Sequence, residues 1–364
     1  MAGANVADKP IPLVVFPYRR RLPIVIGGLA LLTVGLALLG VSLGAVSVPV
    51  DHVVRILAGR LGLLQQTGLV SSADEQIILA IRLPRVVAAI LVGAGLATAG
   101  VLFQGLLRNP MADPYIIGTS GGASLGATLA LMAAAQLGWQ LEWLGFGLVP
   151  VCAFVGASAT VMVVYNVARV GKRTPITTLL LAGFAIGSML TAVMSFLMMI
   201  GEHTLRGTLL WLMGGLGSST WEQLAFVGAL MLAGLFVTYA FAGDLNALLM
   251  GEEQASFLGV EVEKRKVWLL ALGSLLTGAA VSISGLIGFV GLVVPHVARL
   301  AFGPDHRLLV PAAALLGGSF LLLADLIARL VLAPTEIPVG IVTALTGAPF
   351  FLYLLRRHRH EYRL

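Results

Sequence analysis

The side chains that could do chemistry are few in this chain, and their spacing predicts no reaction centre. His296 and His306 lie in "PHVARLAFGPDHR", and His203 lies in "IGEHTLRG". No cysteine–histidine group has the spacing of a metal site. A structural or gating role suits His296 and His306, and a surface position suits His203. We therefore expect no catalytic residue, no metal site and no cofactor, and the pattern disfavours an intramembrane enzyme.

The sequence also lacks the phosphate-binding loop of a nucleotide site. The nearest stretch, "VGKRT" at 170–174, has Asn166 where the first glycine of a phosphate-binding loop belongs. The apolar runs hold almost no ionisable residue away from their ends. Asp325 comes nearest, and it stands four residues before Arg329, which predicts an ion pair along a helix. Because intramembrane acids mark proton and ion relays, an ion-coupled secondary transporter is only the alternative function.

Composition places the chain in a membrane. Of 364 residues, 58% are hydrophobic and 11% are charged, whereas soluble domains carry about 25% charged residues. The 44 glycines suit membrane helices, whose backbones approach closely at small residues. The net charge of +6 does not indicate nucleic acid, because its basic residues cluster between hydrophobic runs. The single cysteine, Cys152, lies in an apolar run, and the first 21 residues predict no cleaved signal peptide.

The apolar runs predict an all-α polytopic membrane protein, because a spanning helix needs about 20 such residues. The expected spans are 22–46, 85–106, 117–137, 147–168, 177–200, 222–242, 267–284, 286–302, 308–330 and 338–355. They form one transmembrane domain, 22–355, between an N-terminal segment, 1–21, and a tail, 356–364. The insert 47–81 carries an amphipathic patch expected to lie flat on the surface, and 205–218 predicts a further half-helix.

Loop charge predicts the orientation. With ten spans both termini fall on one side, which collects 17 of the 23 lysines and arginines and is therefore cytoplasmic. The opposite side receives only six: Arg55, Arg60, Arg82, Arg85, Arg206 and Arg329.

Six blocks of sequence, in order, resemble one family. They are "RLPR" (82–85), "GVLFQGLLRNPMADPYIIGTSGGASLG" (100–126), "WLMGGLGSSTW" (211–221), "GLIGFVGLVVPHVARL" (285–300), "GPDHR" (303–307) and "EIPVGIVTALTGAPFFLYLL" (336–355). From about residue 80 to its end the chain resembles the FecCD-type permeases, membrane subunits of type II ABC importers for ferric siderophores, haem and cobalamin.

The resemblance implies a permease in the bacterial inner membrane with about ten transmembrane helices per subunit. It implies a homodimer with two ATPase subunits, which hold ATP and Mg, and a periplasmic substrate-binding protein. The cargo would be a metal chelate or a corrinoid, with an iron complex favoured, and membrane lipid surrounds the protein.

The resemblance also assigns three groups of residues. The loop 243–266 would form short coupling helices against the ATPase, punctuated by Gly251 and Gly259 and carrying apolar Leu248, Leu249, Ala255, Phe257 and Leu258. Asn109 and Met111, in "LRNPMADP", with Ile176 and Thr177, in "GKRTPITTLL", would line a cytoplasmic gate. Arg82, Arg85 and Arg329, expected on the outer surface, would receive acidic residues of the binding protein, since arginine pairs carboxylates through two hydrogen bonds. Membrane anchoring, or pairing of Arg329 with Asp325, is the alternative.

Overall fold

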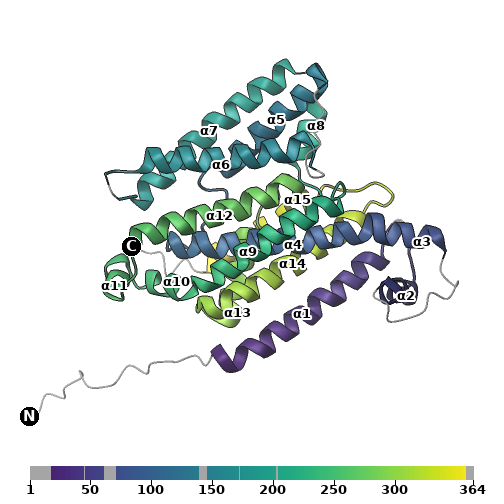
Figure 1. The fold of residues 1–364 in the computed structure, drawn as a ribbon, viewed down its shortest axis with the longest axis horizontal. Helices are drawn as coiled ribbons and strands as arrows, with labels where there is room; N and C mark the ends of the chain where they lie inside the picture. The colour runs from purple at the N-terminus through teal and green to yellow at the C-terminus, as the bar shows by residue number, and fades with distance from the viewer. Residues whose placement is uncertain are drawn as a thin grey trace, which may run out of the picture.

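A computed structural model describes residues 18–44, 46–60, 71–138, 146–171, 173–201 and 204–357 as a bundle of helices (Figure 1). The helices are α1 (Tyr18–Ser42), α2 (Val50–Arg60), α3 (Ser72–Gln76), the π-helical turn η1 (Ile77–Arg82), α4 (Leu83–Leu106), α5 (Thr119–Leu137), α6 (Leu148–Ala168), α7 (Ile176–Ile200), α8 (Leu205–Leu212), α9 (Trp221–Ala240), α10 (Ala242–Leu249), α11 (Glu252–Phe257), α12 (Val262–Ser284), α13 (Val290–Phe302), α14 (His306–Leu330) and α15 (Val339–Arg357). Most of the two predicted terminal segments, and His203, lie outside the described residues.

Every predicted span coincides with a helix. In the described part of the chain, seven helices are long and apolar enough to cross a membrane, and α13 and α15 are shorter apolar helices. The 19 residues of α5 make up the remaining predicted span. The predicted half-helix at 205–218 is α8, and the amphipathic patch of the insert forms α2, which buries Val53 and Ile56.

Local signals set several helix ends. Asp305 caps α14, its carboxylate accepting a hydrogen bond from the backbone N–H of Arg307. Thr220 and Gln223 form a capping box at the start of α9. Pro84 is the second residue of α4 and stands directly after the π-helical turn η1. The two caps fix where α14 and α9 start, and so the lengths of the connections before them.

The centre of the bundle is the continuous helix Ser72–Leu106, made of α3, η1 and α4. Its α4 part contacts α9, α12, α13 and α14 and is buried over most of its length. In Figure 1 these helices run side by side, with α10 and α11 at one end of the bundle and α2 and α3 at the other. We call these the α11 end and the α3 end.

Glycines let α4 approach its neighbours at backbone distance. A Cβ added at Gly93 would overlap the carbonyl oxygen of Gly317 in α14, and one at Gly100 would overlap that of Gly291 in α13. Lipid gives helices no hydrophobic reason to associate, so this close van der Waals contact is what holds them. Side chains at these positions would push α13 and α14 away from α4.

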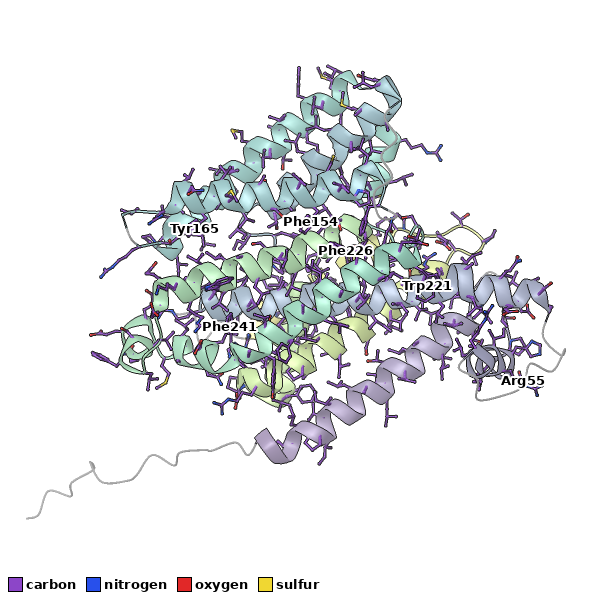
Figure 2. All side chains as sticks on the ribbon, viewed as in Figure 1. Arg55, Phe154, Tyr165, Trp221, Phe226 and Phe241 are labelled. Carbon is purple, nitrogen blue, oxygen red and sulfur yellow. The ribbon has the colours of Figure 1, made fainter. Side chains whose placement is uncertain are left out.

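A second group of helices, α5 to α8, packs on α12. Figure 2 shows Phe154 of α6 directed toward α12, and a Cβ at Gly278 of α12 would lie 3.4 Å from its ring. The outer face of α7 keeps large apolar side chains exposed, among them Phe184 at 73% and Phe196 at 59%. That face meets lipid or another protein chain.

The glycine contacts predict that glycine-to-alanine substitutions at two positions differ in their effect on thermal stability. Gly100→Ala should lower the thermal unfolding temperature in detergent by several degrees, because overpacking of this kind costs about 1–3 kcal/mol. Gly28→Ala in α1 is the matched control, since an added Cβ there has nothing within 4 Å. Unfolding followed by tryptophan fluorescence measures both. If Gly100→Ala unfolds at the same temperature as Gly28→Ala, the close contact between α4 and α13 does not determine the stability of the bundle.

Candidate functional site

A cluster of buried charges closes the α3 end. Asp325 of α14 lies at its centre, fully buried. Arg85 Nε donates to Asp325 Oδ1 at 2.8 Å, and Arg329 Nε lies 3.0 Å from Asp325 Oδ2. Arg85 Nη1 also donates to both carboxylate oxygens of Glu336, at 3.0 and 2.8 Å. The predicted pairing of Asp325 with Arg329 is confirmed, and Asp325 additionally joins α14 to α4.

Two of the arginines hold the last turn of α1. Arg82 donates to the carbonyl oxygens of Val41 and Ser42, each at 2.8 Å, and to that of Val46. Arg329 donates to the carbonyls of Gly40 at 3.0 Å and Leu43 at 3.2 Å. The last carbonyls of a helix have no partner within it and carry partial negative charge, so guanidinium groups stabilise them.

This placement differs from the expected exposure of the three arginines. Arg82, Arg85 and Arg329 are only 7%, 9% and 6% exposed, because α1 and α14 cover them and supply their hydrogen-bond acceptors. Their docking role stays a prediction. Glu336, which the sequence analysis missed, is the member of the cluster nearest the surface, with half its side chain exposed. It lies 251 residues from Arg85, and no local pattern indicates the pairing.

The loop at the α11 end has the predicted form. Its two short helices, α10 and α11, are separated by Gly251, and Gly259 follows α11, both with positive φ, at 120° and 87°. L-residues adopt this conformation only with strain, which is why glycine stands there. Lys266, 5% exposed, ties α11 to α12 through Glu252 at 2.8 Å and Glu263 at 3.1 Å.

Burial divides the residues assigned to ATPase coupling into two sets. Leu248 and Ala255 are buried at 3% and 0%, so they anchor the loop on the core, and their part in ATPase coupling stays a prediction. The exposed apolar residues form what we call the apolar ridge: Leu249, Met250, Phe257 and Leu258. Phe257 is 83% exposed and Leu258 65%. Met250 was not among the predicted contacts.

Asn246 connects α10 to the start of α14. Its Oδ1 accepts the backbone N–H of His306 at 2.9 Å and lies 2.8 Å from His306 Nδ1. Its Nδ2 donates to Asp305 Oδ1 at 2.8 Å. His306 is fully buried, and a Cβ at Gly105 of α4 would lie 3.1 Å from its Nε2. The structural role predicted for His306 fits this arrangement, in which one amide joins the ridge-bearing helix to α14.

Of the residues assigned to the gate, two lie in the connection after α4 and two in the first turn of α7. Asn109 Oδ1 accepts the N–H of Met111 at 2.9 Å, so its side chain shapes the turn after α4. Thr177, at the start of α7, is exposed, and Ile176 is half-buried. Further along both segments, Gly183 packs against the backbone of Ile117. The gating role of all four residues stays a prediction.

A hollow of about 590 Å³ lies between α7 and the segment 115–121. Hydroxyl groups line part of it: Ser120, Ser188, Thr191 and Ser195. Beneath it, Tyr115 donates through its hydroxyl to the carbonyl of Ile287 at 3.1 Å, and burial raises the pKa of the neighbouring Asp113 to about 6. The hollow has the size of a ligand pocket, about 300–1,000 Å³, and opens on the exposed face of α7.

The buried cluster predicts a large stability effect. Asp325→Asn should lower the unfolding temperature strongly, because removing one partner from a buried ion pair costs about 3–5 kcal/mol. Glu75→Gln is the matched control, since Glu75 pairs with Arg60 at 2.9 Å on the surface, where such a pair contributes about 0–1 kcal/mol. Equal unfolding temperatures for the two variants would contradict the central place of Asp325.

Comparisons with known proteins agree with this architecture. The model of the FecCD transport family matches residues 31–357. The cobalamin import system permease protein BtuC of Halobacterium salinarum is 47% identical, over 79% of this chain and 75% of its own. The hemin transport system permease protein HmuU of Yersinia pestis is 43% identical, over 77% and 83%. A solved inward-facing metal-chelate type ABC transporter superimposes with a TM-score of 0.78 at 32% identity, covering 92% of this chain and 99% of that one. With its helices, its loop at the α11 end and nearly its whole length matched, the chain belongs to the FecCD transport family.

Proposed function

We propose that the chain is the permease subunit of an ATP-binding-cassette importer that moves an iron complex or cobalamin into the cytoplasm. The apolar ridge is the observation that carries this proposal. Four large apolar side chains project from a loop outside the spans, on helices fixed by Lys266 and Asn246. Exposed apolar residues on a rigid support indicate a protein contact. Since the chain has no phosphate-binding loop, that partner supplies ATP hydrolysis, and this chain performs no covalent chemistry.

The orientation follows from the same assignment. The α11 end is cytoplasmic and the α3 end periplasmic, with both termini in the cytoplasm, as the loop charges favour. Two copies of the chain and two ATPase subunits form the transporter. The exposed face of α7 and its hollow suit a pathway shared between the copies, with Asn109, Met111, Ile176 and Thr177 near its cytoplasmic end.

The binding protein docks at the α3 end. At that end the buried cluster fixes the surface. Arg82 and Arg329 hold the end of α1, and Arg85 pairs with the half-exposed Glu336. An acidic residue of the partner would approach Arg85 beside the half-exposed Glu336. The relatives named for cobalamin and for hemin support a metal-chelate or corrinoid cargo, and an iron complex remains the favoured choice.

Uptake by reconstituted liposomes tests the function. The chain with its cognate ATPase, binding protein and ATP should accumulate labelled cobalamin, haem or a ferric siderophore, and the chain alone should accumulate none. Accumulation of any of them by the chain alone on a proton gradient would support the alternative, an ion-coupled secondary transporter.

The same assay locates the ATPase contact. Leu258→Asp should abolish ATPase co-purification and uptake, because a carboxylate buried in an apolar contact is left without a partner. Leu137→Asp is the control, since Leu137 is 62% exposed, close to the 65% of Leu258, but ends α5 away from the ridge. Co-purification of the ATPase at wild-type yield with Leu258→Asp would overturn the role of the ridge.

Asn246 provides a separate test of coupling. Asn246→Ala removes the links from α10 to Asp305 and His306 while leaving the ridge intact. We expect the ATPase to bind at wild-type yield, with the number of cargo molecules moved per ATP reduced at least roughly fivefold, a loss of about 1 kcal/mol of coupling. Asn166→Ala is the control, because that exposed amide donates to the carbonyl of Met162 in its own helix. An unchanged transport ratio for Asn246→Ala would show that α10 acts without this link.

A further inference from the structure

Lys266, in the second turn of α12, is the centre of a charged network at the α11 end. It is 5% exposed, and its Nζ lies 2.8 Å from Glu252 Oε2 and 3.1 Å from Glu263 Oε1. Figure 1 shows α11, the start of α12 and the connection from α6 to α7 at the same end of the bundle. We propose that Lys266 is a positioning residue, through which a displacement of α11 moves both connections that lead to the predicted gate residues, 107–114 and 170–175.

The second oxygen of Glu252 reaches the connection after α4. Glu252 Oε1 lies 3.9 Å from Arg108 Nη2, and a Cβ at Gly251 would lie 3.9 Å from Arg108 Nη1. Arg108 has a φ of 49°, in the left-handed region. A residue other than glycine keeps such a conformation only where its surroundings hold it, and Glu252 is part of that support. Asn109 follows directly, so α11 is tied to the turn that carries Asn109 and Met111.

The second oxygen of Glu263 reaches the connection before α7. Glu263 Oε2 accepts a hydrogen bond from the backbone N–H of Thr174 at 3.0 Å, across 89 residues of the chain. Thr174 is 3% exposed, so its N–H relies on this carboxylate rather than on water. Pro175 caps α7 directly after it, and Ile176 and Thr177 begin that helix. The position of Glu263 therefore sets where α7 starts.

One buried ammonium group thus holds both connections. Each carboxylate gives one oxygen to Lys266 and the other to a connection, so neither connection can leave α11 without breaking a charged contact. Separating the partners of a buried ion pair is costly, and the network therefore moves as one unit. Phe257 and Leu258 of the apolar ridge stand at the end of α11. Pressure on the ridge is transmitted through Lys266 to both connections.

The two residues before Lys266 have other partners. Lys264 pairs with Glu261 at 2.6 Å, and both side chains are largely exposed, at 76% and 70%. Arg265 pairs with Asp244 of α10 at 2.7 Å. Of these three consecutive cations, it is Lys266 that reaches α11 from a buried position. Lys264 therefore offers a matched control in the same helix.

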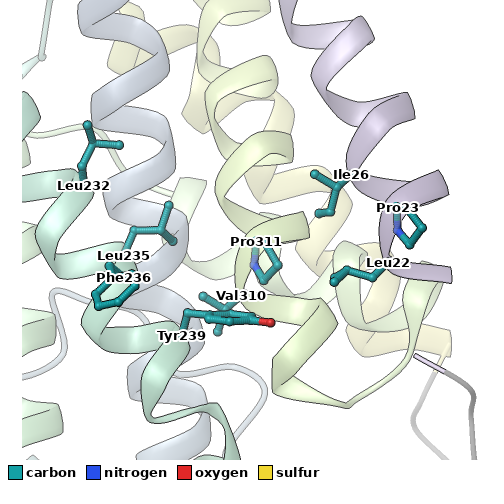
Figure 3. Close-up of a pocket in the computed structure, with 9 residues that line it drawn as sticks. All are labelled: Leu22, Pro23, Ile26, Leu232, Leu235, Phe236, Tyr239, Val310 and Pro311. Carbon is teal, nitrogen blue, oxygen red and sulfur yellow. The ribbon is translucent and has the colours of Figure 1, made fainter. Parts of the chain in front are cut away.

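Contacts of a different kind occur on the α1 side of the bundle. A groove of about 490 Å³ between α1, α9 and α14 is lined there by apolar side chains and the ring of Tyr239 (Figure 3). Apolar contact is non-directional, and packed helices can slide by small amounts across it. Ion pairs fix the positions of their partners more closely. The network of Lys266, rather than packing of this kind, transmits a displacement of α11.

Hydrogen exchange of the purified chain alone, followed by mass spectrometry, tests the links one by one. Lys266→Met should raise exchange in peptides covering 107–114 and 170–175 about tenfold, because both connections are released. Glu252→Gln should raise it in 107–114 only, and Glu263→Ala in 170–175 only. Unchanged exchange in either connection of Lys266→Met would overturn the proposal.

Two further variants separate positioning from general stability. Lys264→Met removes a lysine from an exposed pair and should exchange like the wild type. Lys266→Arg keeps a cation between the two carboxylates and should restore wild-type exchange in both connections. Peptides of α4 should exchange equally in every variant. A rise in α4 as large as that in the connections would show that Lys266→Met loosens the whole bundle, and would overturn a positioning role.

The effect on transport rests on the proposed function and is measured separately in liposomes with the ATPase, the binding protein and ATP. The probe is whichever of labelled cobalamin, haem or ferric siderophore the wild type accumulates. Lys266→Met should bind the ATPase at wild-type yield but move at least roughly fivefold fewer cargo molecules per ATP, and Lys264→Met should keep the wild-type ratio.

The two assays distinguish the two possible failures. A wild-type transport ratio for Lys266→Met would overturn its part in coupling while leaving the proposed function intact. If the wild type accumulates none of the three probes, the proposed function fails, and hydrogen exchange of the chain alone still decides whether Lys266 holds the two connections.

Discussion

Backbone contact between α4 and its neighbours is the constraint on which the remaining structure depends. Water drives apolar surfaces together, but inside a membrane the surroundings of a helix are as apolar as the helix, so association requires close van der Waals contact. Gly93 and Gly100 give that contact to α14 and α13 by removing the only atoms that would prevent it. Once α4 is held in this way, Arg82 and Arg85 at its start come within reach of α1 and α14. The buried charge is thus a consequence of helix packing.

Helix α14 links the two ends of the molecule. At the α11 end Asn246 hydrogen-bonds to the start of α14 beside the apolar ridge. At the α3 end Asp325 and Arg329 tie α14 to α4 and α1. Both attachments are polar contacts in places from which water is largely excluded, where an unmet hydrogen bond is costly. A displacement of the loop at the α11 end therefore acts on a rigid helix that is fixed at both ends, and flexible side-chain packing cannot absorb it.

The helices could be predicted from the sequence because each spanning run carries its own signal of length and composition. Gly251 and Gly259 likewise predicted the two short helices, because glycine is a local signal for a helix end. Burial of the three arginines was not predictable, because Arg82 and Arg329 donate to carbonyls at the end of α1 and Arg85 pairs with carboxylates 240 and 251 residues away in the chain. The pairing of Glu336 with Arg85 was missed for the same reason. Leu248 and Ala255 were assigned to ATPase coupling from the family resemblance and from their apolarity, and neither distinguishes a residue that faces the core from one that faces outward.

The attachment of α1 has a consequence for how the protein is made. This helix is synthesised before α14, yet two of its polar contacts lie far downstream: the hydroxyls of Thr33 and Ser319 lie 2.8 Å apart across 286 residues, and the carbonyl of Gly40 accepts a hydrogen bond from Arg329 across 289. Until α14 has been synthesised, α1 lacks these two partners, while nearer contacts such as those of Arg82 with the carbonyls of Val41 and Ser42 can already form. Its exposed leucines and its lack of interior charge suit that interval. The packing of α1 against α14 is therefore completed only after α14 has been inserted.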